Sequence, residues 1–160
     1  MVHCLTGAIA EHWLGTHNIH VLSNQDLYSL RVELTDWNRQ VRVAEYSSFL
    51  VTDEQDGYRM FVSGFSGDAG DGLSNHHGFE FKVATGATDT TSGSDCVPLV
   101  HGAWWESHCG GSNLNGKYYK DADVTHSDRI VWKTLTLSEK CLKKVEMKIR
   151  PRNADDRLLL

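Results

Sequence analysis

Long apolar runs are missing from this sequence. No stretch of the 160 residues approaches the roughly 18 consecutive apolar residues that a membrane-spanning helix needs. The first ten residues, MVHCLTGAIA, also lack the basic start and the apolar length of a secretory signal. We therefore expect no membrane span, and the opening taken literally predicts a chain that starts in the cytosol.

An excess of basic residues is also missing. Sixteen Lys and Arg face 21 Asp and Glu, which gives a formal net charge of −5. A nucleic-acid partner is therefore not expected. With 40% hydrophobic and 23% charged residues, intrinsic disorder is excluded and a single buried core is favoured. Small-molecule and protein ligands stay open.

The motifs of the common enzyme classes are absent. The chain has no G-x-S-x-G elbow, no H-E-x-x-H pair and no cysteine–histidine nucleophile signature. The glycine-rich residues 64–72 lack the lysine of a phosphate-binding loop, and we interpret them as turns organised by Asp71. Nine histidines include the neighbours His76 and His77, but none has a cysteine or carboxylate at zinc-site spacing. We therefore expect a protein that is not an enzyme, with hydrogen-bonded or surface histidines.

Proline is scarce and helical periodicity is weak. The chain has two prolines against 14 glycines, which favours a loop-rich α+β fold. Residues 31–34 and 144–149 alternate at the strand period, and residues 58–62 form a third strand that leads into the glycine-rich loop. Residues 52–57 and 138–142 are each candidates for a short turn.

Cysteine is limited to four residues, Cys4, Cys96, Cys109 and Cys141. Their number is even and no C-x-x-C spacing points to zinc or redox chemistry. Sequence reasoning alone leaves all three pairings open.

One segment resembles a known family. Residues 96–119 read CVPLVHGAWWESHCGGSNLNGKYY, and the double tryptophan, the second cysteine and the SNLNG run together resemble the fibrinogen C-terminal domain family. The runs LRVELTDW at 30–37, YRMFVSGFSGDAGDGL at 58–73 and EMKIRP at 146–151 extend the resemblance. The resemblance covers residues 10–151 and leaves residues 152–160 as a tail without an assigned function. The N-terminal subdomain that usually comes before the segment beginning at Glu11 in this family has no counterpart in the resemblance.

The resemblance implies an extracellular or secreted module with a twisted antiparallel sheet, few short helices and a large loop-rich ligand region. It also implies a disulfide between Cys96 and Cys109, and closing so short a loop contributes about 3 kcal/mol in the chain-entropy account. Cys4 and Cys141 have no counterparts in the family. They are left to pair with each other, to pair with another chain, or to stay thiols.

Family members hold calcium just before the first of the two cysteines, with a D-x-D pair and backbone carbonyls. This chain has Thr88, Asp89 and Thr90 at that place. Asp89 and Asp95 are the only carboxylates of the loop, whereas calcium takes six to eight oxygen ligands. Calcium therefore stays open as a cofactor, with these two residues as its candidate ligands.

Many family members also bind acetyl groups of sugars, between two aromatic walls and backbone N–H donors. The implied pocket is degenerate here, because nearly every side chain differs from the family's pattern. Its positions are the two walls, Val100 and His126; the residue after the second cysteine, Gly110; the small residue, Ser127; and the peptide whose cis form would present the donors, His108–Cys109.

Other residues of the motif have a simpler interpretation. Trp104 and Trp105 are expected to support the core rather than stack on sugars, and Asn113 and Asn115 to satisfy loop backbone groups. The basic residues of the last strand are expected to form its solvated face, not a patch for an anionic partner.

Two functional hypotheses follow from the resemblance. The first is a lectin-like recognition protein of innate immunity, which binds glycans or microbial surfaces through the loops around residues 86–129. The second is a protein-interaction module of matrix or receptor signalling. A truncated paralogue without binding of its own is a third reading, and an oligomer stays open because avidity serves weak lectin sites.

Overall fold

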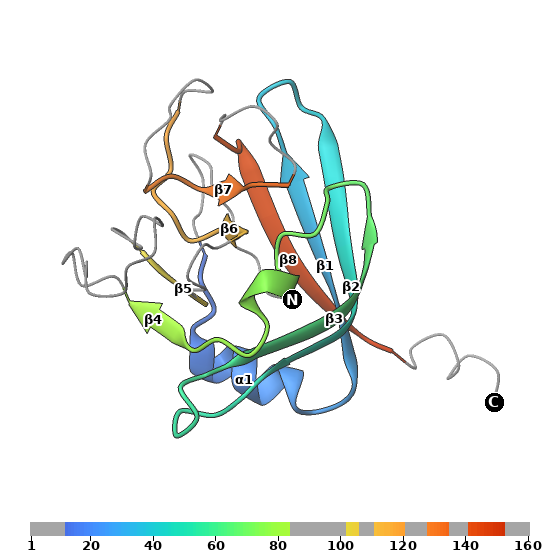
Figure 1. Ribbon diagram of the computed structural model, residues 1–160, viewed down its shortest axis with the longest axis vertical. Helices are drawn as coiled ribbons and strands as arrows, with labels where there is room; N and C mark the ends of the chain where they lie inside the picture. Colours follow the sequence, from blue (N-terminus) through green and yellow to red (C-terminus); the bar gives the residue numbers. More distant parts are fainter. Residues whose placement is uncertain (1–11, 84–101, 106–110, 121–127, 135–140, 153–160) are drawn as a thin grey trace.

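The computed structural model describes residues 12–83, 102–105, 111–120, 128–134 and 141–152. This part of the chain contains one α-helix, one 3-10 turn and eight strands (Figure 1). In chain order they are α1 (Thr16–Ser23), β1 (Tyr28–Thr35), β2 (Val41–Val51), β3 (Met60–Gly67), η1 (Ser74–His76), β4 (Phe81–Val83), β5 (Ala103–Trp105), β6 (Ser112–Asn113), β7 (Val131–Trp132) and β8 (Lys144–Pro151).

The main sheet has four antiparallel strands in the order β3-β2-β1-β8. Strands β1 and β8 come from opposite ends of the sequence, yet they pair over eight residues, from Tyr28↔Pro151 to Thr35↔Lys144. Both alternate between buried and more exposed residues, as their period-2 patterns predict. The two predicted strands are therefore confirmed, and their pairing places β8 at one edge of the sheet.

The long central strand β2 was not predicted. Its alternation breaks at Ser47 and Ser48, where the register against β1 shifts between Tyr28 and Leu30. Such a β-bulge inserts one residue and bends the strand, so the period-2 signal is lost in the middle. Strand β3 also runs further than expected, to Gly67, well into the glycine-rich residues.

The helix α1 was not predicted, whereas the short turn expected at residues 52–57 is confirmed. The helix α1 spans eight residues, Thr16–Ser23, of which only Ile19 and Ser23 are buried. A helix with so few buried positions carries little apolar periodicity for sequence analysis to detect. Residues 52–57 form a turn, in which Gly57 N–H donates to the Glu54 carbonyl at 3.1 Å, while residues 138–140 lie outside the described part.

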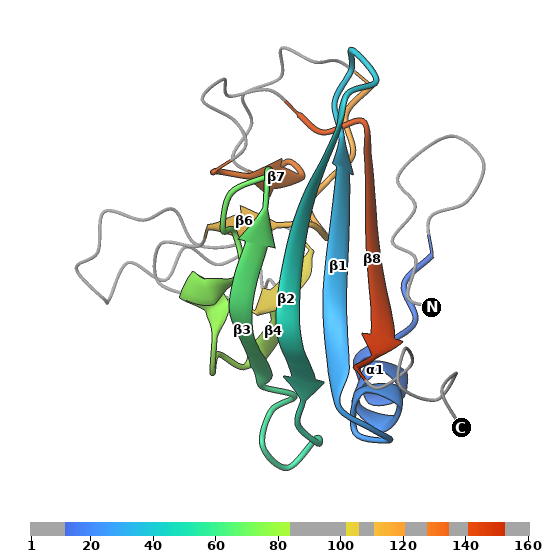
Figure 2. The ribbon, with the colours of Figure 1, turned by 90° about the vertical axis from the view of Figure 1, so that its right-hand side faces the viewer.

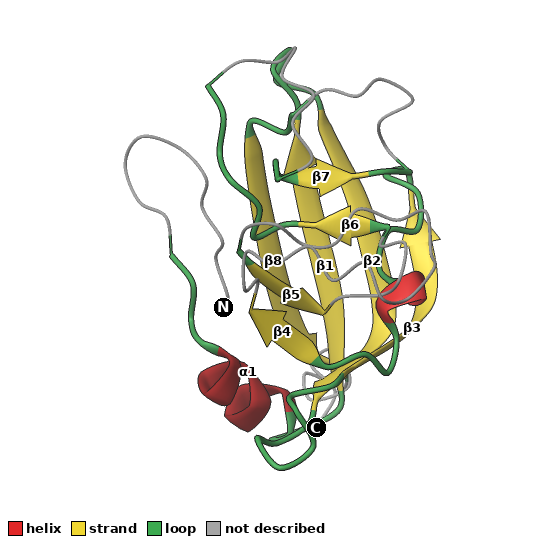
Figure 3. Ribbon diagram, turned by 60° about the vertical axis from the view of Figure 1, so that its left-hand side comes forward, coloured by secondary structure: helices red, strands yellow, loops and turns green. Residues whose placement is uncertain are grey.

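The small strands pack over one face of the main sheet, as Figure 3 shows. They form two pairs, β4 with β5 and β6 with β7. The core between the layers is built around three tryptophans with no exposed surface, Trp104, Trp105 and Trp132. The interpretation of the double tryptophan as core support is thus confirmed. The opposite face of the main sheet is not covered by any helix or strand of the described residues (Figure 2).

Among the described residues, no helix is long and apolar enough to cross a membrane.

Candidate functional site

The predicted ligand region, residues 86–129, is described only at its supporting parts. Strand β5 begins at Ala103, β6 follows the second cysteine in the sequence, and β7 comes directly after the region ends. All residues of the degenerate pocket, of the calcium site and of the predicted disulfide lie outside the described residues: Val100, His108, Cys109, Gly110, His126, Ser127, Asp89, Asp95 and Cys96. Cys4 lies outside them too, whereas Cys141 is described and buried, at 3% exposed.

His76 connects the two ends of the segment that carries the second cysteine. Its ring is buried, with 1% exposed, and Nδ1 lies 2.5 Å from the Trp105 carbonyl oxygen. On the other side of the ring, Nε2 lies 3.0 Å from the Ser112 backbone nitrogen, which donates. A carbonyl only accepts and an N–H only donates, so the contacts assign the proton to Nδ1 and leave Nε2 as the acceptor. One neutral imidazole therefore fixes both residues that flank residues 106–111.

His77 is turned to a different part of the fold. Its Nδ1 lies 2.7 Å from the Val62 carbonyl oxygen, and its ring meets the Phe61 ring edge-on. The two neighbouring histidines thus do not converge, and the described residues contain no group of three or more His, Cys, Asp or Glu that could hold a metal. The prediction of hydrogen-bonded histidines is confirmed for this pair.

Strand β5 is anchored by the indole of Trp105. Its Nε1–H donates to the Tyr58 carbonyl at 2.7 Å, and its ring packs edge-on against Phe81 with 5.1 Å between centroids. Trp13, from the segment before α1, stacks on Phe81 at 5.6 Å and also lies 6.3 Å from the Trp105 ring, so the three rings form one cluster. Residues from four distant parts of the chain therefore hold the start of the ligand region in place.

The SNLNG run is a turn that holds itself and its neighbours. Asn113 Oδ1 accepts from the Asn115 backbone N–H at 3.1 Å, and Asn115 Nδ2 donates to the Ala103 carbonyl at 3.1 Å. The backbone of Gly102 passes so close to the Asn115 carbonyl that a Cβ there would overlap it, and Gly116 lies equally close to the Arg129 carbonyl. The two asparagines serve backbone groups, as predicted, and the glycines permit the close approach of three chain segments.

Asp71 organises the glycine-rich loop, as the sequence predicted. Its Oδ1 accepts from the Tyr46 hydroxyl at 2.8 Å and from the backbone N–H groups of Leu73 and Ser74 at 3.2 and 3.0 Å. Burial alone would raise the pKa of this carboxyl, but the hydrogen bonds from Ser74, Tyr46 and Leu73 outweigh it and lower the pKa. Burial and the bond to Asp71 raise the pKa of Tyr46.

The same loop is tied to β7. Trp132 Nε1 lies 3.1 Å from each of the Ala69 and Gly70 carbonyl oxygens. A Cβ at Gly72 would overlap the Trp132 ring, so only glycine lets the loop lie against this indole. The glycine-rich loop therefore packs against Trp132, in the strand that directly follows the predicted ligand region.

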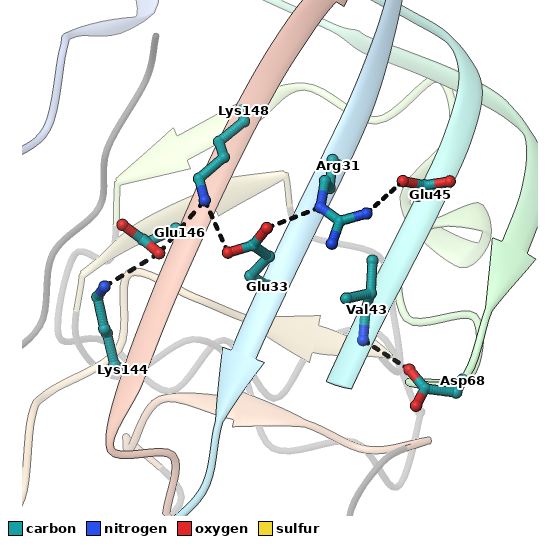
Figure 4. Close-up of polar contacts among 8 residues, drawn as sticks. All are labelled: Arg31, Glu33, Val43, Glu45, Asp68, Lys144, Glu146 and Lys148. Atoms are coloured by element: carbon teal, nitrogen blue, oxygen red, sulfur yellow. Dashed lines mark hydrogen bonds and ion pairs between the residues drawn. The ribbon is translucent and has the colours of Figure 1, made fainter. Parts of the chain in front are cut away.

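A ladder of charged side chains crosses the open face of the main sheet (Figure 4). Lys148 Nζ lies 2.7 Å from Glu33 and 3.5 Å from Glu146, and Arg31 bonds to Glu33 at 2.7 Å and to Glu45 at 2.5 Å. Hydrogen bonds from Lys148 and then Arg31 lower the pKa of Glu33 to about 2. The basic residues of β8 form a solvated face, as predicted, but the pairing of Lys148 with Glu33 on β1 was not foreseen.

Comparison with known proteins agrees with this geometry. Residues 5–152 match the family described as the C-terminal globular domain of fibrinogen beta and gamma chains. The chain belongs to this family. Fibrinogen-like domains are in general extracellular recognition modules and are in general not enzymes.

The chain is 40% identical, over 157 residues, to Fibrinogen C domain-containing protein 1-B of Xenopus laevis, a match that covers 95% of this chain and 34% of that protein. It is also 40% identical, over 156 residues, to Fibrinogen C domain-containing protein 1 of Homo sapiens, covering 94% and 33%. The chain thus spans about a third of the length of these relatives.

Solved structures share the fold. The fibrinogen-like globe domain of human ANGPTL6 superimposes with a TM-score of 0.77 at 30% identity, over 92% of this chain and 68% of that one. Lamprey fibrin D-dimer in complex with the peptide Gly-His-Arg-Pro-amide gives a TM-score of 0.78 at 31% identity, over 95% and 55%. The predicted family and the predicted fold of antiparallel sheets with few short helices are both confirmed.

Sequence analysis did not predict the roles of two residues that support the ligand region, His76 and Tyr46. His76 was weighed only as a zinc ligand or a hydrogen-bonded side chain, and nothing in its local sequence points to Trp105 or Ser112. Tyr46 was not singled out, because its role depends on contact with Asp71, 25 residues away. The role of His76 depends on how η1 lies against β5 and β6, and that of Tyr46 on how β2 lies against the loop after β3.

Proposed function

We propose that this chain is an extracellular, lectin-like recognition module that binds glycans, including those of microbial surfaces, through the loops around residues 86–129. The observation that carries the proposal is the bridge that His76 makes between Trp105 and Ser112. It fixes the ends of the segment that contains Cys109 and two positions of the predicted pocket, His108 and Gly110. Binding sites in loops depend on rigid supports of this kind.

The proposed pocket would select acetylated sugars by its backbone more than by its side chains. An apolar slot for the methyl group and N–H donors for the carbonyl oxygen are the requirements. Val100 and Ser127 supply small or apolar surface, His126 supplies a ring, and the backbone around His108 and Cys109 supplies the donors. The many substitutions in the pocket predict weak binding at a single site, so an oligomer would be needed for high avidity.

Calcium is not required by the proposed chemistry. The two candidate ligands, Asp89 and Asp95, offer only part of the six to eight oxygens that calcium takes. The described residues show no cluster that would add to them. The effect of calcium on sugar binding is measured by titration with and without the ion.

The test is isothermal titration calorimetry of the oxidised protein with N-acetylglucosamine, with and without calcium. Glucose, which lacks the acetamido group, is the matched control ligand. Saturable heat with the acetylated sugar and none with glucose would support the proposal, and a stronger signal with calcium would assign the ion a role. Absence of heat in both conditions, from protein whose fold is verified by circular dichroism, would contradict it.

A protein-interaction module of matrix or receptor signalling is the second candidate. It is supported by the likeness to lamprey fibrin D-dimer, whose solved structure holds the peptide Gly-His-Arg-Pro-amide. A glycan array without hits, together with saturable binding of that peptide to this chain, would favour the second candidate over the first.

A further inference from the structure

The main sheet has an open face on the side away from the small strands (Figure 2). A groove lined by residues of all four strands crosses this face. Its floor is a row of short side chains, one from each of three neighbouring strands: Ser29 on β1, Ser47 on β2 and Gly64 on β3. Ser47 and Ser48 form the β-bulge, and a Cβ at Gly64 would overlap the Ser47 hydroxyl. The bulge bends the sheet and the short side chains leave space above it, so the groove has a volume of about 520 Å³.

One wall of the groove is a row of long polar side chains. Glu45, Arg31 and Lys148 lie directly opposite one another on β2, β1 and β8, and Ser66 on β3 continues the row. Glu45 accepts one bond from Arg31 and is otherwise exposed to solvent, with 49% of its side chain accessible. The wall therefore offers a carboxylate acceptor, a hydroxyl and two cations that already pair with carboxylates of the sheet.

The β8 end of the groove is electropositive. Arg31, Lys148 and Lys144 are balanced by Glu33, Glu45 and Glu146 in the charged ladder. Arg150, in contrast, is exposed and makes no ion pair with any residue that the structure describes. Its guanidinium offers the planar fork that matches a carboxylate with two parallel hydrogen bonds.

These groups suit a sugar better than a peptide. Extended peptides bind to a free strand edge or place side chains in apolar pockets, and the groove runs across β1 and β2, which have a partner strand on both sides. Tyr46 is the aromatic residue of the lining, but it is fully buried and offers no exposed anchor. The groove offers instead hydroxyls, a carboxylate and cations. Sugar hydroxyls donate to carboxylates and exchange bonds with serines, and an acidic group would lie at Arg150.

We propose that this groove is a second binding site, for an acidic oligosaccharide that places its carboxylate at Arg150 and its ring hydroxyls over Ser29, Ser47 and Glu45. The site is separate from the loops around residues 86–129 and does not depend on the function proposed for them. A carboxylated glycan would thus be held on the open face of the sheet while the loops contact another part of the same surface.

The test is a titration of the ¹⁵N-labelled full chain followed by amide chemical shifts. The probes are a disaccharide containing glucuronate, the corresponding neutral disaccharide containing glucose, and a hexaglutamate peptide. We expect saturable shifts at amides of Ser29, Arg31, Glu45 and Arg150 with the acidic sugar alone. We expect Arg150→Gln to weaken binding by about tenfold or more, because a charge-assisted bond is lost. Arg42→Gln is the matched control, since Arg42 is also exposed but pairs with Asp68 and does not line the groove.

Four results would overturn the proposal. They are equal shifts with the neutral disaccharide, binding of the peptide but not the sugar, an unchanged affinity of Arg150→Gln, or shifts confined to residues 111–120 beside the loop site. The last result would support the loop site instead, so the two proposals fail independently. Because Arg150 is exposed, the spectrum of the free variant is expected to match that of the unmodified chain and to verify its fold.

Discussion

Replacing His76 with alanine removes the side chain that holds both ends of the segment before and after Cys109. The Trp105 carbonyl and the Ser112 N–H lose their partner in a region where His76 itself is 1% exposed. A buried polar group left without a partner costs roughly 1–3 kcal/mol, so the two together predict a loss of about 4 kcal/mol in the free energy of unfolding. Domains of this size are stable by only about 5–15 kcal/mol, so the effect would be large.

Urea denaturation of the oxidised protein, followed by tryptophan fluorescence, measures this loss. His77→Ala is the matched control, because His77 is adjacent but exposed, and we expect it to cost about 1 kcal/mol or less. His76→Gln keeps a donor and an acceptor on one planar group, so its loss should fall between the two. The reasoning is refuted if His76→Ala costs no more than His77→Ala, or if N-acetylglucosamine binding persists unchanged in a destabilised His76→Ala.

Two further predictions concern the sheet and the glycine loop. The pKa of Glu33 falls from about 4.5 to about 2 on folding, so its pairing with Lys148 stabilises the protein above pH 4.5, and this contribution is lost as the pH falls from 4.5 toward 2. Glu33→Gln should therefore lower stability at pH 7 and flatten its pH dependence in that window, as measured by denaturation at several pH values; an unchanged profile would show that the ladder contributes nothing. Gly72→Ala would push a methyl group into the Trp132 ring and should cost about 2 kcal/mol or more in thermal denaturation, whereas Gly78→Ala meets no atom within 4 Å and bears only the strain of its positive φ, about 1 kcal/mol. Equal losses in the two glycine variants would contradict the contact with Trp132.

The sequence predicted the elements whose pattern is local. Strands β1 and β8 alternate without interruption, and Asp71 stands in a run of glycines where a carboxylate commonly caps backbone N–H groups. Strand β2 was not predicted, because the bulge at Ser47 and Ser48 interrupts its period-2 alternation. Helix α1 escaped because it begins after Gly15, with no side-chain cap, and buries few residues. In both cases tertiary packing, not local pattern, holds the element.

The charged ladder and the His76 bridge could not be predicted for a different reason. Each joins residues that are far apart in the chain, such as Glu33 with Lys148, 115 positions later, and His76 with Ser112, 36 positions later. A sequence pattern shows that Lys148 lies on the polar face of a strand, but only the strand register shows which carboxylate lies opposite. Predicting these contacts therefore requires the pairing of β1 with β8 before any side chain is considered.

The residues that identify the family mostly support the fold rather than contact a ligand. Trp104 and Trp105 are buried, and Asn115 with Gly116 closes the turn against neighbouring backbone. Such residues are required by the fold whatever the ligand is, because they satisfy backbone groups and fill the core. The pocket positions that the resemblance implies, such as Val100 and His126, are predicted to differ from the family pattern. The same motif can therefore fix the fold while leaving the ligand to be determined by measurement at the loops and at the groove on the open sheet face.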